Sequence, residues 1–262
     1  MAKVYGVDGS ALRETKLPKT FSSDHRPDII KRAVLSIQSG NRQKYGADKL
    51  AGKRTSAHYH GRRRKRNTMM GRGIARMARI HGKVGYLSLR ARFVPQAVKG
   101  RGAHPPKAGK VWEKMINRKE LLLALESALA AAASRELVGK RGHVFDGEVP
   151  IILEEKFESV SKAGELEKIL EKIGLGKEIE RCKQRKSAAG KGKRRGRSGG
   201  EKKGMLFIVS KQCPLLKAAE NLPGTSAVIV NKISMEQLAP GTHAGRLLLI
   251  TEPSLSEIEK MF

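Results

Sequence analysis

The amino-acid sequence predicts an α/β protein: a largely parallel sheet with helices on both faces, and a long basic extended loop inserted near the N-terminal third. Two observations predict this architecture. From residue 117 onward, short apolar runs of strand length alternate with amphipathic runs of helix length, which is typical of a parallel sheet covered on both faces. The excess positive charge is confined to two segments that cannot join a core. We therefore expect a single α/β domain over residues 1–262, an extended basic loop over 41–110 and a basic surface loop over 181–204.

The N-terminal part of the chain is predicted to contribute a strand and a helix. Residues 3–7 form a strand that ends in a turn at Asp8 and Gly9. A helix is predicted over residues 27–39, because a proline suits its first turn and Gly40 follows as a stop. The folded body is thus expected to begin before the first basic segment.

A second helix is predicted directly after that segment. Asn117 can cap it, with Glu120 three residues later in the reciprocal capping-box position. The leucines and alanines that follow form one apolar stripe, and Gly139 is expected to end the helix. Because these two helices bracket the first basic segment, we interpret the segment as an insertion into the domain and not as a tail.

The remainder of the chain continues the alternation. Residues 144–153 are predicted as one or two extended pieces, and a helix is expected from Ser161 to a stop at Gly174. The other apolar runs are predicted as strands over residues 205–209, 227–230 and 247–250, and the other amphipathic runs as helices over residues 214–221, from Ser234 and from Ser254.

Charge is distributed very unevenly along the chain. Residues 41–110 hold 20 Lys and Arg against one acid, and residues 181–204 hold 11 against one. The resulting charges of +19 and +10 account for the whole net charge of +29, so the other residues, with 23 bases and 23 acids, are neutral. A neutral body with two concentrated cationic segments indicates a polyanionic partner, and nucleic acid above all.

The first segment combines these cations with features that suit unpaired bases. Tyr59, Tyr86 and Phe93 could stack on bases, and ten glycines within residues 41–110 would let the backbone approach phosphates. The sequence holds no helix-turn-helix, zinc-finger or basic-zipper pattern, so RNA is favoured over DNA. On charge we predict RNA contacts at Lys53, His58, Arg62, Arg63, Arg64, Lys65, Arg66, Arg76, Arg79, Arg90, Arg92, Lys99 and Lys110 in the first segment, and at Lys193, Arg194, Arg195 and Arg197 in the second.

Other interpretations of the two segments stay open. The first could be a flexible basic loop without a defined partner, and the second a nuclear-import or nonspecific patch. Spacings of three and four residues would align Arg72, Arg76 and Arg79 on one side of a short helix or an extended twist. The histidines of the first segment are irregularly spaced with no cysteine or carboxylate nearby, so we predict no metal site.

An RNA-modifying enzyme is the main alternative function, because doubly wound sheets often bind nucleotides. The strand ends carry no glycine-rich nucleotide turn, and the Gly71–Ala75 stretch lies inside the basic segment and follows no strand. There is also no G-x-S-x-G or H-E-x-x-H motif. Cys213 is interpreted as a small buried residue and not as a nucleophile. We predict no catalytic residue and no cofactor.

The cellular setting follows from what the sequence contains. The longest apolar run, residues 121–133, is interrupted by Glu126 and falls short of the roughly 20 residues that a membrane span needs. The N-terminal residues lack the apolar block of a signal peptide. We therefore expect a cytosolic protein in which Cys182 and Cys213 remain free thiols.

Several short motifs then point to a known family. In order and spacing they resemble the L-four family of large-subunit ribosomal proteins, in its archaeal and eukaryotic cytosolic branch. The motifs are AGKRTSA at residues 51–57, GRG at 71–73, VPQ at 94–96, GR at 100–101, AHPPK at 103–107 and INRKE at 116–120.

The resemblance implies a structural constituent of the large ribosomal subunit that stabilises large-subunit rRNA during assembly. It implies a globular α/β domain on the outer face, beside neighbouring large-subunit proteins, and a loop that penetrates the RNA to line the peptide exit tunnel. Carried over residue by residue, it adds RNA contacts at Arg54, Arg72, Arg101, His104 and Lys107. Arg72, Arg76 and Arg79 would line the tunnel near the nascent peptide. The chain departs from the family pattern between His58 and Met70, so whether Arg62–Arg66 or Arg72–Arg79 reaches the tunnel stays open. A nonspecific nucleic-acid condensing protein is the second alternative function.

Overall fold

The computed structural model of the chain describes residues 2–66, 68–81 and 85–262. It separates into two compact units. The first, called the body here, consists of Met1–Asn41 and Glu113–Phe262, and the second, called the insert, consists of Arg42–Trp112. Residues 67 and 82–84 of the predicted loop lie outside the described residues.

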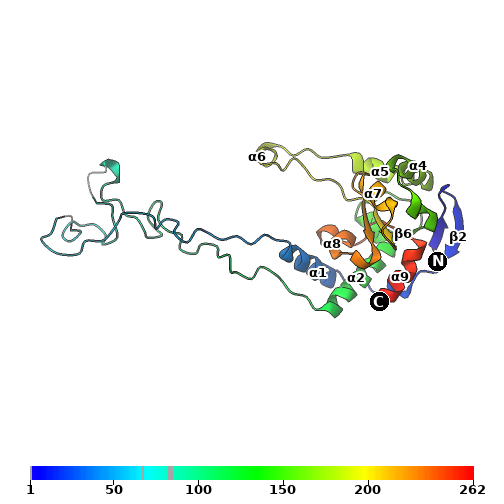
Figure 1. Cartoon of the computed structure of the whole chain (residues 1–262), viewed down its shortest axis with the longest axis horizontal. Helices are drawn as coiled ribbons and strands as arrows, with labels where there is room; N and C mark the ends of the chain where they lie inside the picture. Colours follow the sequence, from blue (N-terminus) through cyan, green and yellow to red (C-terminus); the bar gives the residue numbers. More distant parts are fainter. Residues whose placement is uncertain (1, 67, 82–84) are drawn as a thin grey trace. The chain divides into compact units, whose positions relative to one another are not determined.

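The body is built on one six-stranded sheet in the order β2-β1-β3-β6-β4-β5 (Figure 1). Its strands pair in parallel except for β2, which lies antiparallel to β1 at one edge. The strands are β1 (Ala2–Tyr5), β2 (Ala11–Thr15), β3 (Ile151–Leu153), β4 (Leu206–Val209), β5 (Ser226–Ile229) and β6 (Leu248–Thr251). The prediction of a largely parallel sheet is therefore confirmed.

The register of the sheet places one buried aliphatic residue from each of five strands in a single row. Each of these residues is the direct partner of the next across the sheet, and together they face one layer of helices. The row consists of Val4, Ile152, Ile250, Ile208 and Val228. Because side chains alternate between faces along a strand, their sequence neighbours face the opposite layer.

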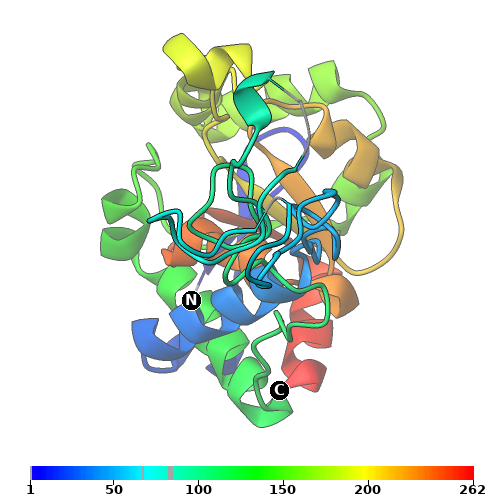
Figure 2. The same ribbon diagram turned by 90° about the vertical axis from the view of Figure 1, so that its left-hand side faces the viewer.

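Helices cover both faces of the sheet, as the alternation of strands and helices predicts. One apolar layer contains α1 (Pro27–Gly40), α2 (Arg118–Ala133), α8 (Met235–Leu238) and α9 (Glu252–Met261). The other contains α3 (Arg135–Lys140), α4 (Ala163–Ile173), α5 (Gly176–Lys183) and α7 (Pro214–Glu220). In Figure 2 the first layer, with α1 in blue and α9 in red, lies below the sheet, and α4 and α5, in yellow-green, lie above it.

The other helical segments are short. They are α6 (Gly190–Arg194) and the 3-10 turns η1 (Lys19–Ser22), η2 (Gly85–Leu87), η3 (Glu155–Ser159), η4 (Val230–Lys232) and η5 (Pro240–Thr242). Of the described helices, none is long and apolar enough to cross a membrane.

The structure corrects several predicted boundaries. The helix after Asn117 ends at Ala133 and not near Gly139, because Ser134 takes an extended backbone and starts the separate helix α3. Asn117 is the N-cap residue of α2, but its side chain makes no capping hydrogen bond. The last helix begins at Glu252, so the hydroxyl of Ser254 is buried and donates to the Thr251 carbonyl, 2.5 Å away.

The insert has little regular secondary structure. Its described residues contain the turn η2 and two isolated antiparallel bridges, His58–Arg79 and Arg79–Ala91. Its first and last stretches run side by side, since the Ala47 amide donates to the Pro106 carbonyl at 2.9 Å. One methionine, Met69, is buried with 1% of its surface exposed. The insert is thus held by backbone bonds and turns and not by an apolar core of its own.

Candidate nucleic-acid interface

An open cleft lies between the two stretches of the insert that run side by side. It is lined by residues 46–53 on one side and 101–110 on the other. The basic residues at its walls include five of the predicted RNA contacts together with Lys49. The five are Lys53, Arg101, His104, Lys107 and Lys110. A cleft bordered by cations from two chain segments can hold a phosphate backbone between them.

The cleft contains one acid, and that acid is neutralised within the insert. Asp48 accepts hydrogen bonds from the Leu50 amide and from the Arg54 guanidinium. These two donors, the Leu50 amide first, lower the pKa of Asp48 below its ordinary value. Asp48 therefore stays ionised. Arg54, a predicted RNA contact, pairs with this carboxylate and remains exposed to solvent.

Glycine is required where the two stretches come closest. Gly52 has a positive φ of 71°, and a Cβ at this position would overlap the carbonyl group of Gly100. Any side chain here would clash with backbone, which cannot move aside as a flexible side chain can. The absence of a side chain at Gly52 thus sets the separation of the cleft walls.

An aromatic pair stands at the end of the insert next to the body in sequence. The rings of Tyr45 and Trp112 lie 5.1 Å apart, centroid to centroid. Arg42 and Lys110 lie over the Trp112 ring at 4.5 and 4.9 Å from its centroid. Tyr45 is 50% exposed and could stack on a base. The rings predicted from the sequence to stack on bases were those of Tyr59, Tyr86 and Phe93. This pair was not among them, although Trp112 is the one tryptophan of the chain.

The densest basic run presents its charge to solvent. Arg62–Arg66 are all exposed, and none of these side chains donates a hydrogen bond to another described residue. Five cations without acidic partners repel one another, and a polyanion would relieve this repulsion. Arg72, Arg76, Arg90 and Lys99 are exposed as well.

Arg79 does not align with Arg72 and Arg76 on a helix, and the hydrogen bonds give the reason. In a helix the Arg79 amide would donate to the Ala75 carbonyl. Instead that carbonyl accepts from the Arg79 guanidinium at 2.9 Å, while the Arg79 amide donates to the His58 carbonyl at 3.1 Å. The guanidinium also donates to the Leu89 carbonyl at 2.9 Å. Arg79 therefore braces the insert.

Arg92 has a similar bracing role. It is half-buried, and its guanidinium donates to the Val98 carbonyl at 2.6 Å. Charge alone could not separate such bracing arginines from exposed ones. Three of the four histidines of the insert also meet: His58, His60 and His81 form one cluster, whereas His104 lies in the cleft.

The second basic segment begins later than predicted. Arg181 to Lys183 belong to helix α5, where Cys182 is buried, so the segment outside the helix starts at Gln184. Its four predicted contacts are all exposed, three of them in or next to the short helix α6. They are Lys193, Arg194, Arg195 and Arg197.

A buried ionic cluster holds one end of the second segment. The Glu178 carboxylate accepts hydrogen bonds from His143 Nδ1 at 2.6 Å and from Arg181 at 2.7 Å. Burial raises the pKa of Glu178, but hydrogen bonds from Arg181, His143 and the Val144 amide outweigh it and lower the pKa to about 2. Arg181 also donates to the Lys203 carbonyl at 2.9 Å, which ties the returning end of the segment to α5.

Arg246 holds the same returning end from within the core. It is 2% exposed and donates to the carbonyls of Gly204 and Met205, at 2.8 and 3.1 Å. It also donates to the Ser226 hydroxyl and the Gln237 carbonyl. Burial lowers the pKa of Arg246 to about 10. Its role is structural, since its donors are directed at protein carbonyls.

The sequence analysis missed a second basic surface, a groove on the body. Chain segments far apart in sequence converge on it, and two of its five lysines and arginines come from the neutral part of the chain. Its walls include Lys140, Arg141, Arg181, Lys202 and Lys203. Burial, and then the neighbouring Arg181, lowers the pKa of Arg141. Such a convergence of cations gives no signal in local sequence composition.

The two cysteines are placed as small core-lining residues. Cys182 is buried and Cys213 is half-buried at the N-cap of α7. Burial raises the pKa of both thiols, which opposes formation of the nucleophilic thiolate. This agrees with the interpretation of Cys213 as a packing residue.

Comparison with known proteins identifies the family. Residues 15–261 match the model of the ribosomal protein L4/L1 family. The chain is 45% identical over 262 residues to the large ribosomal subunit protein uL4 of Nanoarchaeum equitans, covering 98% of this chain and 97% of that protein. It is 44% identical to the uL4 protein of Archaeoglobus fulgidus, covering 97% and 96%, and 40% identical to that of Methanosphaera stadtmanae, covering 100% and 98%. The chain therefore belongs to the ribosomal protein L4/L1 family, in its archaeal branch.

Proposed function

We propose that this protein is a structural constituent of the large ribosomal subunit that binds and stabilises large-subunit rRNA. The observation that carries the proposal is the cleft of the insert, which Lys53 lines on one side and Arg101, Lys107 and Lys110 line on the other, and whose single acid is neutralised by Arg54. Relatives that match nearly the full chain are named as large-subunit proteins. The protein would act in the cytoplasmic ribosome and carry out no catalysis.

The insert, predicted as residues 41–110, is proposed to be the extended element that threads between RNA helices. Its charge of +19, its exposed arginines and its small apolar content suit a segment surrounded by phosphates. A role at the exit tunnel belongs to the same proposal: Arg72 and Arg76 would line the wall near the nascent peptide, with Arg79 bracing the chain behind them.

The body is proposed to bind RNA on a second, separate surface. Lys193, Arg194, Arg195 and Arg197 would contact phosphates along the exposed segment that starts at Gln184. The groove with Lys140 and Lys203 would receive a further stretch of backbone, while Arg141 donates to the Pro240 and His243 carbonyls and holds the groove wall. Neighbouring large-subunit proteins are expected to contact the parts of the body that carry no excess charge.

Fractionation of ribosomes tests the proposal. In a gradient after a high-salt wash, we expect one copy of the chain in each large subunit, and a density map of that subunit should place the insert within rRNA. A chain that sediments free of ribosomes would overturn the proposal in favour of a nonspecific nucleic-acid condensing protein. Substoichiometric association together with RNA-methyltransferase activity would overturn it in favour of the enzyme.

A further inference from the structure

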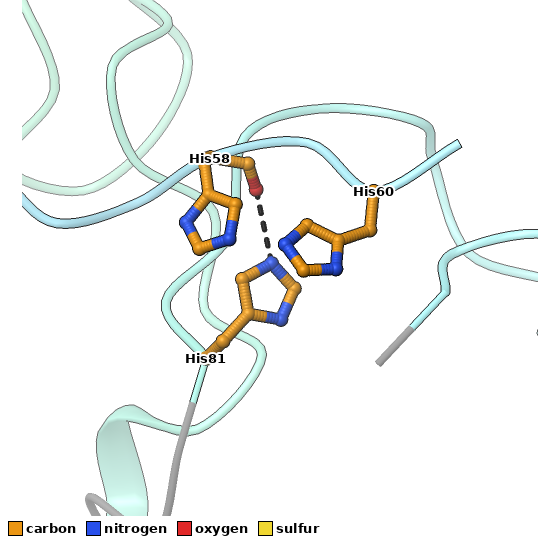
Figure 3. Close-up of side chains that lie close together, drawn as sticks. All are labelled: His58, His60 and His81. Carbon is orange, nitrogen blue, oxygen red and sulfur yellow. Dashed lines mark hydrogen bonds between the residues drawn. The ribbon is translucent and has the colours of Figure 1, made fainter. Parts of the chain in front are cut away.

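Three histidine side chains of the insert meet at one point (Figure 3). His58, His60 and His81 have ring centroids 4.2 to 4.5 Å apart. One ring nitrogen from each lies within 4.8 Å of the nitrogens offered by the other two. His58 and His60 come from one stretch of chain and His81 from another, so the cluster joins two segments.

The backbone around the cluster holds these segments in register. The His58 amide donates to the Arg79 carbonyl at 3.2 Å, and the Arg79 amide donates back to the His58 carbonyl at 3.1 Å. The Met69 amide donates to the His60 carbonyl at 3.0 Å, and Met69 is buried. The three rings are therefore brought together by a bridged framework and not by a chance approach of mobile side chains.

Hydrogen bonds already orient two of the rings. His58 Nδ1 lies 3.0 Å from the Ser56 carbonyl, and His81 Nε2 lies 3.0 Å from the His58 carbonyl. A carbonyl only accepts, so each of these nitrogens must carry a proton, which leaves a lone pair on the other nitrogen of the ring. For His81 that nitrogen is Nδ1, which is buried and has no hydrogen-bond partner among the described residues. In Figure 3 it lies on the side of the ring away from His58 and His60, so the ring must turn about its Cβ–Cγ bond to present it to a metal.

This arrangement resembles the second shell of metal-binding histidines, whose non-coordinating N–H is usually held by a carbonyl or carboxylate. Nitrogens bound to one zinc ion at about 2.0–2.1 Å lie roughly 3.4 Å apart. The present limit of 4.8 Å requires the rings to close by only about 1 Å. Metal binding would also give His81 Nδ1 a partner, which it lacks among the described residues.

The ligand set selects the kind of metal. All three ligands are imidazoles, and the cluster contains no carboxylate of the type that Mg²⁺ and Ca²⁺ require. Imidazole suits zinc and its transition-metal neighbours. The exposed cations of residues 62–66 belong to the same insert and disfavour a weakly bound dication, so binding must come from direct coordination and not from charge attraction.

We propose that His58, His60 and His81 form a zinc site with three protein ligands and one open position, which water occupies in the free protein. The site would clamp residues 58–60 to residue 81 and so fix the turns of the insert between them. It reverses the expectation of no metal site, and it gives His58 a metal-binding role instead of an RNA contact. It needs no RNA, so its test is independent of the proposed function.

The test uses the full-length chain, freed of RNA and treated with chelator. Zinc chloride is titrated against a chromophoric zinc indicator, and bound metal is counted by mass spectrometry after desalting. We expect one zinc per chain. Cobalt substitution should give the visible absorption of a four-coordinate site.

Variants assign the site to its ligands. His60→Ala and His81→Ala should each weaken zinc binding at least tenfold and remove the cobalt spectrum. His104→Ala, a histidine of the same insert outside the cluster, should leave both unchanged. Zinc should also slow tryptic cleavage of the insert in the wild type but not in His81→Ala. Circular dichroism of the body serves to establish that the variants are folded.

The opposite results overturn the proposal. They are less than a fifth of an equivalent of bound zinc, binding that survives in the His60→Ala/His81→Ala double variant, or an equal loss in His104→Ala. Because no RNA is present, any of these outcomes leaves the proposed ribosomal role unaffected.

Discussion

The hydroxyl group of Ser36 donates a hydrogen bond to the carbonyl oxygen of Lys114, 2.5 Å away and 78 positions later in the chain. The Lys114 amide in turn donates to the Ser39 hydroxyl at 2.8 Å. All three residues belong to the body. The point where the chain leaves the body and the point where it returns are therefore fastened together by the body itself.

This fastening predicts that the body folds without the insert. Replacing residues 42–112 by a short glycine-serine linker should leave the α/β circular dichroism signal and a cooperative thermal transition. Adding Ser36→Ala and Ser39→Ala to that variant removes both hydrogen bonds to Lys114, and also the bond from the Ser39 hydroxyl to the Ser36 carbonyl, and should cost about 1 kcal/mol, or roughly 2–4 °C in Tm. A deletion variant without a cooperative transition would place the insert in the core and make the division into two units wrong.

The buried carboxylate of Glu178 should make stability depend on pH. Its pKa is lowered to about 2 in the folded protein, below the ordinary value of 4.5. A lowered pKa means that its stabilisation is complete above about pH 4.5 and is lost as the pH falls toward 2. Glu178→Gln should unfold at lower urea concentration near pH 7, with a free energy of unfolding lower by about 3 kcal/mol, because a neutral amide with one acceptor oxygen replaces the carboxylate that pairs with Arg181 and accepts from His143.

The control for this measurement is Glu180→Gln, an exposed carboxylate in the same helix α5. It should leave the free energy of unfolding and its pH profile as in the wild type. Equal losses in both variants would show that the helix, and not the buried cluster, responds to the change.

Of the arginines of the body, we expect Arg246 to contribute most to the free energy of unfolding. Arg246→Met leaves the Gly204, Met205 and Gln237 carbonyls without this donor, and an unsatisfied buried group costs about 1–3 kcal/mol. We expect a loss of about 3 kcal/mol or more in urea unfolding, with faster tryptic cleavage of residues 184–203. Arg13→Met, which breaks an exposed ion pair with Glu252, should cost less than about 1 kcal/mol. Similar costs for the two variants would contradict a tethering role for Arg246.

The exposed run Arg62–Arg66 should govern the salt dependence of RNA binding. Changing all five to glutamine should reduce the slope of log affinity against log salt by roughly 3.5 to 4.5, at about 0.7 to 0.9 per phosphate contact. Filter binding to large-subunit rRNA at a series of salt concentrations measures this slope. An unchanged slope would mean that these arginines do not contact phosphate. The matched control changes five exposed lysines of the neutral body: Lys16, Lys19, Lys31, Lys168 and Lys172.

The sequence predicts the sheet well because its central strands are buried on both faces. Runs such as residues 206–209 are fully apolar. A short apolar run that alternates with amphipathic helices has few interpretations other than a buried strand. The edge strand β2 was missed because its sequence, ALRET, is exposed at four of five positions and gives no alternation. Helix α5 was missed because its short sequence, GKEIERCK, has a charged residue at five of eight positions.

The candidate site is less predictable, for a different physical reason. Composition shows where the cations lie in the sequence, but it cannot distinguish Arg79 from Arg76. The guanidinium of Arg79 donates to protein carbonyls, whereas Arg76 is exposed to solvent. Nor can it bring His81 to His58, since that contact depends on one backbone bridge between segments 23 residues apart. Such contacts are set by the path of the chain, which local periodicity does not encode.

The close approach of Gly52 to the Gly100 carbonyl has a consequence for how this protein can vary. Lysine and arginine can replace each other at many positions of a phosphate-binding surface with modest loss, because charge acts over several ångströms. A methyl group at Gly52, in contrast, would overlap the backbone of Gly100. In a scan of all single substitutions scored by growth, we expect the least replaceable residue of the cleft to be this glycine and not any of its cations. Natural selection on a segment defined by its charge would then act most strictly on a position that carries none.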